Sequence, residues 1–361
     1  MKRGVSQLTR LRHPSILTVE HPLEESRDCL AFATEPVLAS LSNLIIQENI
    51  SSEIPSHLLN YQLEPLEVKY GLLQVAEGLA FLHNSGKLLH RNICLESIIV
   101  NCQGAWKISG FEYSLTGGKQ PAGGGGVVAA VTPTWDPPEY DQSQPPECYP
   151  HLDFSAPELA LSSASGGGSV TVSADMFSFG MLAYTIHNKK PLYNTNRNWS
   201  AYKRNTSDLR TIPDSKLVHV PKDLVESVRM LVSRAAELRP TPEQIQQLQY
   251  FQDFGVKTLQ KLDSQFQLDN LQKSQFYKGL TSVLPQLPTR ILVHRVYPCL
   301  AKEFPNASMV PFLLPSVFHI IERCNKEDFR THILPSLIPV MQLMEPVQIL
   351  LLFMQVKLSF F

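Results

Sequence analysis

Charge excess and paired cysteines are both missing from this 361-residue sequence. Its 32 Lys and Arg residues balance 33 Asp and Glu residues, so no basic stripe favours nucleic acid as a partner. The six cysteines are scattered, form no Cys-x-x-Cys pair and have no histidine cluster around them. We therefore interpret them as reduced thiols in a cytosolic protein, and we expect no metal site.

Long, uninterrupted hydrophobic runs are also missing. The last stretch, residues 347–361, is apolar but contains Gln348, Gln355 and Lys357. It is too short to span a bilayer comfortably. We expect no transmembrane segment and interpret this run as part of an interrupted buried helix.

One short segment carries the most informative motif of the chain. Residues 90–97 read HRNICLES. They resemble the catalytic loop of protein kinases, in which His-Arg-Asp is followed five residues later by Asn. In an active kinase the Asp accepts the proton of the substrate hydroxyl and the Asn binds magnesium. Asn92 and Ser97 occupy these two positions, so both chemical groups are missing.

A second metal ligand is missing as well. A hairpin of two short strands is predicted over 98–108, and from residue 110 the chain reads Gly-Phe-Glu where active kinases have Asp-Phe-Gly. Phe111 is kept, whereas Gly110 replaces the metal-binding carboxylate. Together with Asn92 and Ser97, this loss predicts a pseudokinase, which is not an enzyme and binds no cofactor.

Further landmarks of a kinase large lobe follow in the expected order. Apolar spacing predicts a helix over 70–83, directly before the catalytic loop. The resemblance implies that Glu158, in Ala-Pro-Glu, forms a structural ion pair with a buried Arg239. It also implies that Asp175 begins a helix buried on every side and accepts hydrogen bonds from backbone amides of the catalytic loop.

His90 and Arg91 are retained, and two interpretations of them are open. In an active kinase Arg91 would receive a phosphate on the activation segment. We favour the interpretation that both residues pack the loop against Phe111, because the catalytic purpose of the loop is gone.

Only part of a kinase small lobe is predicted. Residues 8–14 resemble the end of helix C, strands are expected at 16–19 and 30–34, and a remnant of the nucleotide-binding hinge is expected at Glu35 and Val37. The strand lysine and the glycine-rich loop that hold ATP phosphates would lie before the first residue. We therefore expect no bound nucleotide.

Two alternatives to a non-catalytic protein remain open. An atypical protein serine/threonine kinase could bind ATP and use Glu112, two positions after the lost carboxylate, as a displaced acid. Successive strand residues point to opposite faces, which argues against this role for Glu112. In the third reading, the full-length protein binds ATP without magnesium at the hinge and acts as a nucleotide-gated switch.

The kinase landmarks end near residue 253. We predict an α+β protein-kinase-like domain over 1–253, made of a mostly helical large lobe and a partial small lobe. Residues 254–361 read as helices broken by proline. The segments LLPS at 313–316 and ILPS at 333–336 are each expected to introduce an apolar helical stretch. They are about twenty residues apart, which is half the length of a HEAT unit. An all-α HEAT-like solenoid is therefore expected to follow the kinase-like domain.

Long sequence segments similar to those of one family are distributed along nearly the whole chain. They are QLTRLRHP at 7–14, HPLEESRDCLAF at 21–32, DNLQKSQF at 269–276 and EPVQILL at 345–351. The chain resembles the Scy-one-like (SCYL) pseudokinase family, truncated at both ends. The resemblance implies a catalytically inactive scaffold of clathrin-dependent vesicle traffic between the plasma membrane, endosomes and the trans-Golgi network.

The same resemblance implies a location and partners. The protein would be cytoplasmic and peripheral on clathrin-coated vesicles, endosomes and Golgi membranes, with clathrin and adaptor complexes as partners. In the family these contacts are made largely by a tail beyond the helical region, so we assign no residue of this chain to them.

Overall fold

The computed structural model describes residues 2–45, 58, 61–118, 133–136, 138, 144–145, 148–161, 170–207, 209 and 212–343. The apolar run at 347–361 lies outside these residues. The chain divides into two compact units. Unit 1 comprises Met1–Leu63, Gly71–Asn101 and Ala105–Phe251, and unit 2 comprises Glu64–Tyr70, Cys102–Gly104 and Gln252–Phe361. The last change of unit thus falls two residues before the predicted domain boundary.

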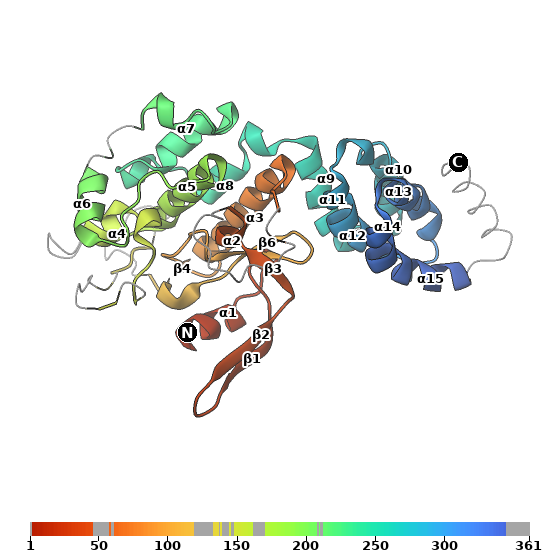
Figure 1. Cartoon of the computed structure of the whole chain (residues 1–361), viewed down its shortest axis with the longest axis horizontal. Coiled ribbons are helices and arrows are strands. Elements are labelled where there is room, and N and C mark those ends of the chain that lie inside the picture. The colour runs from red at the N-terminus through yellow and green to blue at the C-terminus, as the bar shows by residue number, and fades with distance from the viewer. Residues whose placement is uncertain are drawn as a thin grey trace, which may run out of the picture. The chain divides into compact units, whose positions relative to one another are not determined.

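Unit 1 begins with a helix and a pair of strands (Figure 1). α1 is Lys2–Arg10, β1 is Val19–Glu25 and β2 is Leu30–Thr34. The two strands pair antiparallel, and β2 has the bounds predicted from the sequence. α1 lies beside β1 and buries Val5 and Leu8. These elements form one wall of the candidate site.

The prediction of a strand at 16–19 is wrong. Only Val19 belongs to β1, whereas Ile16 makes a single parallel bridge to Ile108. The Leu17 N–H donates to the Ile108 carbonyl at 3.1 Å. Ser15 and Leu17 therefore bond to Ile108 of β6, far along the chain, whereas Val19 pairs with Thr34 of β2.

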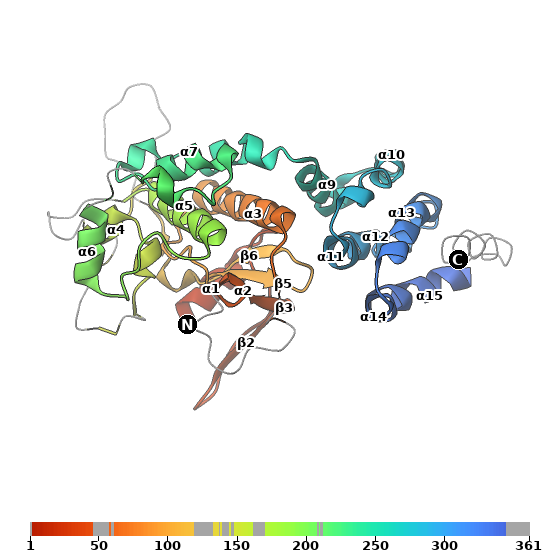
Figure 2. The same cartoon turned by 45° about the horizontal axis from the view of Figure 1, so that its top comes forward.

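Two further antiparallel sheets belong to unit 1, and Figure 2 shows the strands of the first. β3 (Val37–Ser40), β5 (Ile98–Asn101) and β6 (Trp106–Ile108) form the first sheet, in the order β3-β5-β6. β4 (Leu88–Leu89) and β7 (Leu115–Thr116) form the second. β5 and β6 are the hairpin predicted from the sequence, and they lead directly into the segment that replaces Asp-Phe-Gly.

Two long helices form the core of unit 1. α3 spans Pro65–Asn84, and its residues from Gly71 onward belong to this unit. α5 spans Ser173–Asn188, and its residues 174–186 are all buried. α3 lies so close to β6 that a Cβ on Gly71 would be 2.0 Å from the Trp106 ring. Only glycine fits at this crossing.

Shorter helical elements complete unit 1, and α7 packs along α5 (Figure 2). The α-helices are α2 (Leu41–Ile45), α4 (Pro157–Leu161), α6 (Trp199–Ser207), α7 (Lys222–Leu231) and α8 (Pro242–Gln246). The 3-10 segments are Phe111–Tyr113, Leu152–Phe154, Asp214–Lys216, Ala236–Leu238 and Gln249–Phe251.

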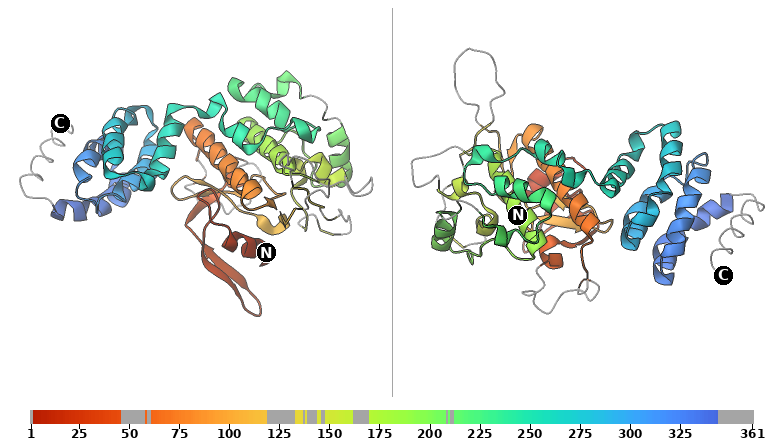
Figure 3. Two further views of the ribbon diagram at one scale, coloured as in Figure 1. Left: turned by 180° about the vertical axis from the view of Figure 1, so that it is seen from behind. Right: turned by 90° about the horizontal axis from the view of Figure 1, so that it is seen from above.

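From Phe254 onward the described part of unit 2 is helical (Figure 3). Its α-helices are α9 (Phe254–Asp263), α10 (Asn270–Leu280), α11 (Thr289–Ile291), α12 (Tyr297–Ala301), α13 (Val310–Arg323), α14 (Lys326–Asp328) and α15 (Leu334–Leu343). Two 3-10 segments, Gln265–Gln267 and Leu284–Gln286, lie between them. α10 and α13 pack against each other.

Two helical stretches of unit 2 contain π-helical turns, at Leu292–Val296 and Phe329–Ile333. Each π turn is followed two residues later by a proline, Pro298 or Pro335. A proline inside a helix has no N–H, and its ring crowds the carbonyl four residues earlier. A π turn, in which hydrogen bonds join residues five apart, widens the helix at this point and so relieves the conflict.

One prediction about the helices of unit 2 is wrong. The segment LLPS at 313–316 does not introduce a helix, because α13 already begins at Val310 and contains Pro315 in its interior. Pro311 occupies the first turn of α13, where a missing N–H costs nothing. The helix start is therefore set by the earlier proline.

Within the described residues, no helix combines the length and the apolar character needed to cross a membrane.

Candidate functional site

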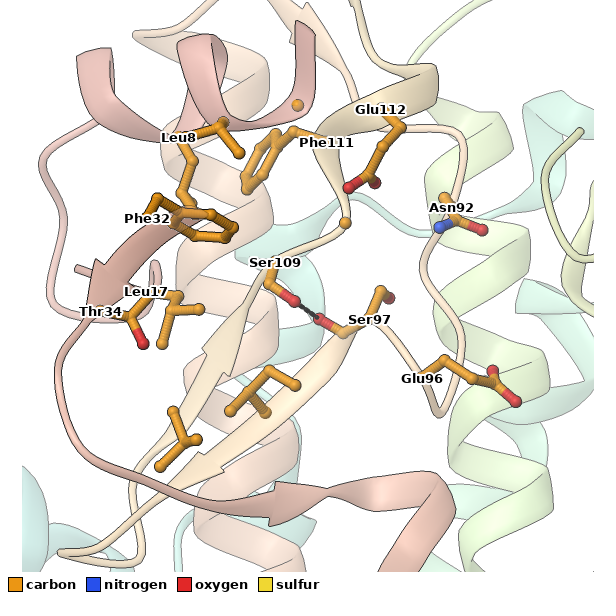
Figure 4. A pocket seen from close by; sticks show the side chains of 15 residues that line it. Leu8, Leu17, Phe32, Thr34, Asn92, Glu96, Ser97, Ser109, Phe111 and Glu112 are labelled. Atoms are coloured by element: carbon orange, nitrogen blue, oxygen red, sulfur yellow. Dashed lines mark hydrogen bonds between the residues drawn. The ribbon is translucent and has the colours of Figure 1, made fainter. Parts of the chain in front are cut away.

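Several candidate site residues, among them Asn92, Ser97 and Gly110, line a cavity of about 440 Å³ in unit 1 (Figure 4). On the side of α1 and β2 its wall is apolar, formed chiefly by Leu8, Leu17, Phe32 and Phe111. On the opposite side it is polar, formed by Asn92, Glu96, Ser97 and Glu112. Among the described residues that line this cavity there is no lysine or arginine, the side chains that usually balance a bound phosphate.

Gly110 is the residue that the sequence motif predicts to replace the second metal ligand of an active kinase. Its φ is +76°, a backbone conformation that residues with a side chain rarely adopt. A Cβ at this position would lie 2.9 Å from the Cβ of Ser97 and 3.3 Å from Nδ2 of Asn92. A carboxylate here would therefore need both a different backbone and different neighbours.

Asn92 and Ser97 make hydrogen bonds within the protein. The Ser97 hydroxyl accepts from the Cys94 N–H at 3.0 Å and donates to the Cys94 carbonyl at 3.1 Å. The side-chain oxygen of Asn92 accepts from the His151 N–H at 3.4 Å. These bonds close the loop on itself and join it to the segment around His151.

Asp175 holds the backbone of the catalytic-loop segment. Its buried carboxylate accepts the His90 N–H at 2.8 Å and the Arg91 N–H at 2.7 Å. It also lies 3.0 Å from Nε2 of His83. Burial alone raises the pKa of Asp175, but the hydrogen bond from His83 and the nearby imidazoles outweigh burial and hold the pKa below its usual 3.8. The structure thus brings Asp175 to the loop, as the resemblance implied.

His90 and Phe111 pack edge to face, with ring centroids 4.6 Å apart. Nε2 of His90 donates to the Ser109 carbonyl at 2.9 Å. Burial lowers the pKa of His90, although nearby Asp175 opposes the shift, so the ring is neutral at pH 7. Figure 4 shows Phe111 reaching toward Leu8 of α1. The loop is therefore linked through Phe111 to the first helix.

Arg91 is tied to the segment that follows Phe111. Its guanidinium donates to the Tyr113 carbonyl at 3.3 Å, and its own φ is +68°. Burial lowers the pKa of Arg91 to about 10, with Arg3 adding to the shift and Asp175 opposing it. This contact supports a packing role for Arg91 over the receipt of a phosphate.

The expected orientation of Glu112 is wrong. Strand alternation predicted that Glu112 points away from the lost metal site, but residues 111–113 form a 3-10 turn. The left-handed backbone of Gly110 starts this turn, and the Glu112 side chain lines the cavity (Figure 4). A Cβ on Gly4 would lie 2.9 Å from the Glu112 carboxylate. The glycine before Phe111 was the sequence signal that could have indicated a turn.

The two residues predicted to be a remnant of the hinge, Glu35 and Val37, differ in their surroundings. Val37 lines the cavity, whereas the Glu35 carboxylate accepts the Thr18 N–H at 3.0 Å and the Asn101 amide at 2.8 Å. The Lys107 ammonium lies 3.5 Å from Glu35. Burial raises the pKa of Glu35, but these three partners outweigh burial and lower the pKa below its usual 4.5. Glu35 therefore fastens the hinge to its neighbouring segments.

Glu158 and Arg239 form an ion pair away from the cavity. Nη2 of Arg239 donates to Oε2 of Glu158 at 3.0 Å, and Nη1 donates to Oε1 at 2.5 Å. The buried guanidinium also donates to the Ser173 and Ser233 carbonyls, at 2.9 Å each. This two-bond geometry is the strongest form of an Arg–carboxylate pair, and it joins α4 to the loop before α8.

Comparison with known proteins identifies the fold of unit 1. Residues 1–251 match the protein kinase domain family. The chain belongs to that family. It is 46% identical over 364 residues to human SCY1-like protein 2, a match that covers 98% of this chain and 37% of that protein. This similarity confirms the resemblance to SCYL proteins, and the chain spans about a third of such a protein's length.

A more distant relative and a solved structure extend this comparison. The probable inactive serine/threonine-protein kinase scy1 of Dictyostelium discoideum is 24% identical over 338 residues, covering 93% of this chain and 35% of that protein. The crystal structure of the yeast RNA Pol II CTD kinase CTDK-1 complex contains a similar chain, with a TM-score of 0.52 and 18% identity. That match covers 70% of this chain and 80% of the other, and it shows the kinase fold alone.

Proposed function

We propose that this chain is a catalytically inactive kinase-like protein that acts as a protein-binding scaffold. The observation that carries the proposal is the steric relation of Gly110 to Ser97 and Asn92, because the space for the second metal ligand is filled by the fold. Loss of a catalytic base alone typically costs about 10²- to 10⁴-fold in rate. The name of the Dictyostelium relative, a probable inactive kinase, agrees with this proposal.

We further propose that the scaffold serves clathrin-dependent vesicle traffic between the plasma membrane, endosomes and the trans-Golgi network. It would be cytoplasmic and peripheral to vesicle membranes, with clathrin and adaptor complexes as partners. The support is the similarity to SCYL proteins along nearly the whole chain. The helices of unit 2 would then be the start of a HEAT-like solenoid, a role that the packing of α10 against α13 supports.

Phosphoryl transfer is the decisive test of the first proposal. We expect no incorporation of labelled phosphate from ATP, with magnesium or manganese, above that of a mock purification. The position of Glu112 in the cavity favours one alternative, an atypical kinase that uses a displaced acid. Transfer that disappears in Glu112→Gln would establish that alternative. A thermal shift produced by ATP without magnesium would instead support a nucleotide-gated switch.

The trafficking proposal is tested by affinity capture from cytosol. The full-length protein and this chain are used side by side, and the captured material is probed for clathrin and its adaptors. Capture by both places a contact within these 361 residues, and capture by the full-length protein alone places it in the remainder. Capture by neither contradicts the proposed partners.

A further inference from the structure

Three side chains of metal-ligating type converge in unit 2. His294 lies in the π turn Leu292–Val296. Asp328 and His332 lie one helical turn apart, at the end of α14 and in the π turn Phe329–Ile333. One ligand atom of each residue lies within 4.8 Å of those of the other two. The two imidazole rings meet edge to face, with centroids 4.7 Å apart.

We propose that His294, Asp328 and His332 bind a divalent transition-metal ion, with Zn²⁺ the best match. Two imidazole nitrogens and a carboxylate oxygen are common zinc ligands at about 2.0–2.2 Å, and they leave the fourth tetrahedral position to water. Ligand atoms around such an ion are roughly 3.4 Å apart, so the present spacing closes with small side-chain rotations. His332 is exposed and can make that rotation.

The chemistry of these ligands discriminates between metals. Magnesium and calcium prefer sites made of oxygen ligands, whereas imidazole suits zinc, copper and nickel. A site with two imidazoles therefore selects the transition metals. The absence of Cys-x-x-Cys from the sequence led us to expect no metal site, but this site uses no cysteine.

The π turns are a second observation that favours this site. Each histidine lies inside a π turn, and the two turns belong to different helical stretches that pack against each other. π turns are rare and frequently occur at functional sites. Since Pro298 and Pro335 account for the widening of each helix, the placement of both rings is built into the sequence.

Asn325 orients the carboxylate ligand. Its side-chain amide donates to Oδ2 of Asp328 at 2.8 Å, and the Asp328 N–H donates back to Oδ1 of Asn325 at 2.7 Å. Oδ1 of Asp328 has no hydrogen bond to another described residue. Such outer hydrogen bonds hold metal ligands in place and are a regular part of metal sites.

The charges around the site are nearly balanced. Arg290 is the unfavourable neighbour, but its Nε donates to the Glu67 carboxylate at 3.1 Å.

A bound ion would connect two stretches of unit 2, Thr289–Ala301 and Lys326–Leu343. Because an ion that binds only the folded state stabilises that state, saturating metal should raise the unfolding temperature of unit 2. All three ligands belong to unit 2, so the site does not depend on the cavity of unit 1.

The test is a zinc titration of the 361-residue chain after its metal has been removed with a chelator. Calorimetry should give one saturable site per chain, and Co²⁺ should give the visible absorption of a tetrahedral site. His332→Gln and Asp328→Asn should each weaken binding at least about tenfold. Glu327→Gln, a matched change of an exposed neighbouring acid, should leave the affinity unchanged.

Two results would overturn the proposal. One is the absence of saturable binding of Zn²⁺ or Co²⁺ by the unsubstituted chain. The other is equal affinity in the unsubstituted chain, His332→Gln and Asp328→Asn, which would place the ion elsewhere. Circular dichroism establishes that each variant is folded, and exposed His332 is the substitution least able to disturb the fold.

Discussion

The Cβ that Gly110 lacks would lie 2.9 Å from the Cβ of Ser97. The two residues predicted from the motif to replace metal ligands therefore fit each other as packing partners. A side chain at 110 collides with the residue at 97, and its backbone must leave the left-handed region. Restoring one ligand alone cannot rebuild a metal site.

Gly110→Asp should destabilise unit 1 by about 1–3 kcal/mol, through backbone strain and overpacking against Ser97. The three tryptophans, Trp106, Trp135 and Trp199, all lie in unit 1, so their fluorescence during urea unfolding measures its stability. Asn92→Asp changes charge with little change of shape and should cost less than about 1 kcal/mol. A Gly110→Asp variant that is as stable as the parent chain and binds Mg²⁺ would contradict this account.

Asp175→Asn should destabilise unit 1 by about 3–5 kcal/mol. The buried carboxylate accepts hydrogen bonds from the backbone N–H groups of His90 and Arg91. The side-chain NH₂ of an asparagine would face one of these N–H groups, so that a donor would meet a donor. Tryptophan fluorescence again provides the measurement. Asp28→Asn, at an exposed position of unit 1, is the control and should change stability by no more than about 0.5 kcal/mol.

The low pKa of Asp175 also predicts a pH dependence. Because the folded-state pKa lies below the usual 3.8, the carboxylate contributes stability that is fully present above that pH. This contribution is lost as the pH falls through the folded-state pKa. The unfolding temperature of unit 1 should therefore fall more steeply below pH 3.8 in the parent chain than in Asp175→Asn. Parallel pH profiles would show that Asp175 does not carry the effect.

Arg239→Gln should also cost about 3–5 kcal/mol, because it leaves Glu158 partly buried without its charge partner. The matched control is Lys2→Gln. Lys2 pairs with Glu25, but these side chains are 58% and 60% exposed, so the change should cost at most about 1 kcal/mol. Equal losses in the two variants would mean that burial does not determine the strength of these pairs.

Cys94 should resist alkylation in the folded chain. Burial, with a smaller contribution from Glu96, raises the pKa of the Cys94 thiol to about 12, so almost no thiolate is present at pH 8. Cys29 and Cys102 are exposed and should react first. Mass spectrometry after timed treatment with iodoacetamide gives the order, and modification of Cys94 as fast as Cys29 would contradict the burial.

Local patterns sufficed to predict the elements that position the site. The strand at 30–34, the hairpin over 98–108 and the helix that contains Asp175 all agree with the structure. Their signals are short-range, because apolar periodicity and turn residues lie within the segments themselves. The prediction that chemical groups are missing at Asn92 and Gly110 likewise rests on the sequence motif alone.

Tertiary structure decided the features that depend on distant partners. Ile16 pairs with Ile108, 92 positions later, and no local pattern distinguishes that bridge from a strand. The direction of Glu112 follows from the turn that Gly110 starts, and the meeting of His294 with His332 follows from the packing of two helical stretches. The sequence by itself determined the short-range elements and the predicted loss of catalytic groups at Asn92, Ser97 and Gly110. Only the fold decided which remaining side chains meet, because that depends on long-range packing and not on local periodicity.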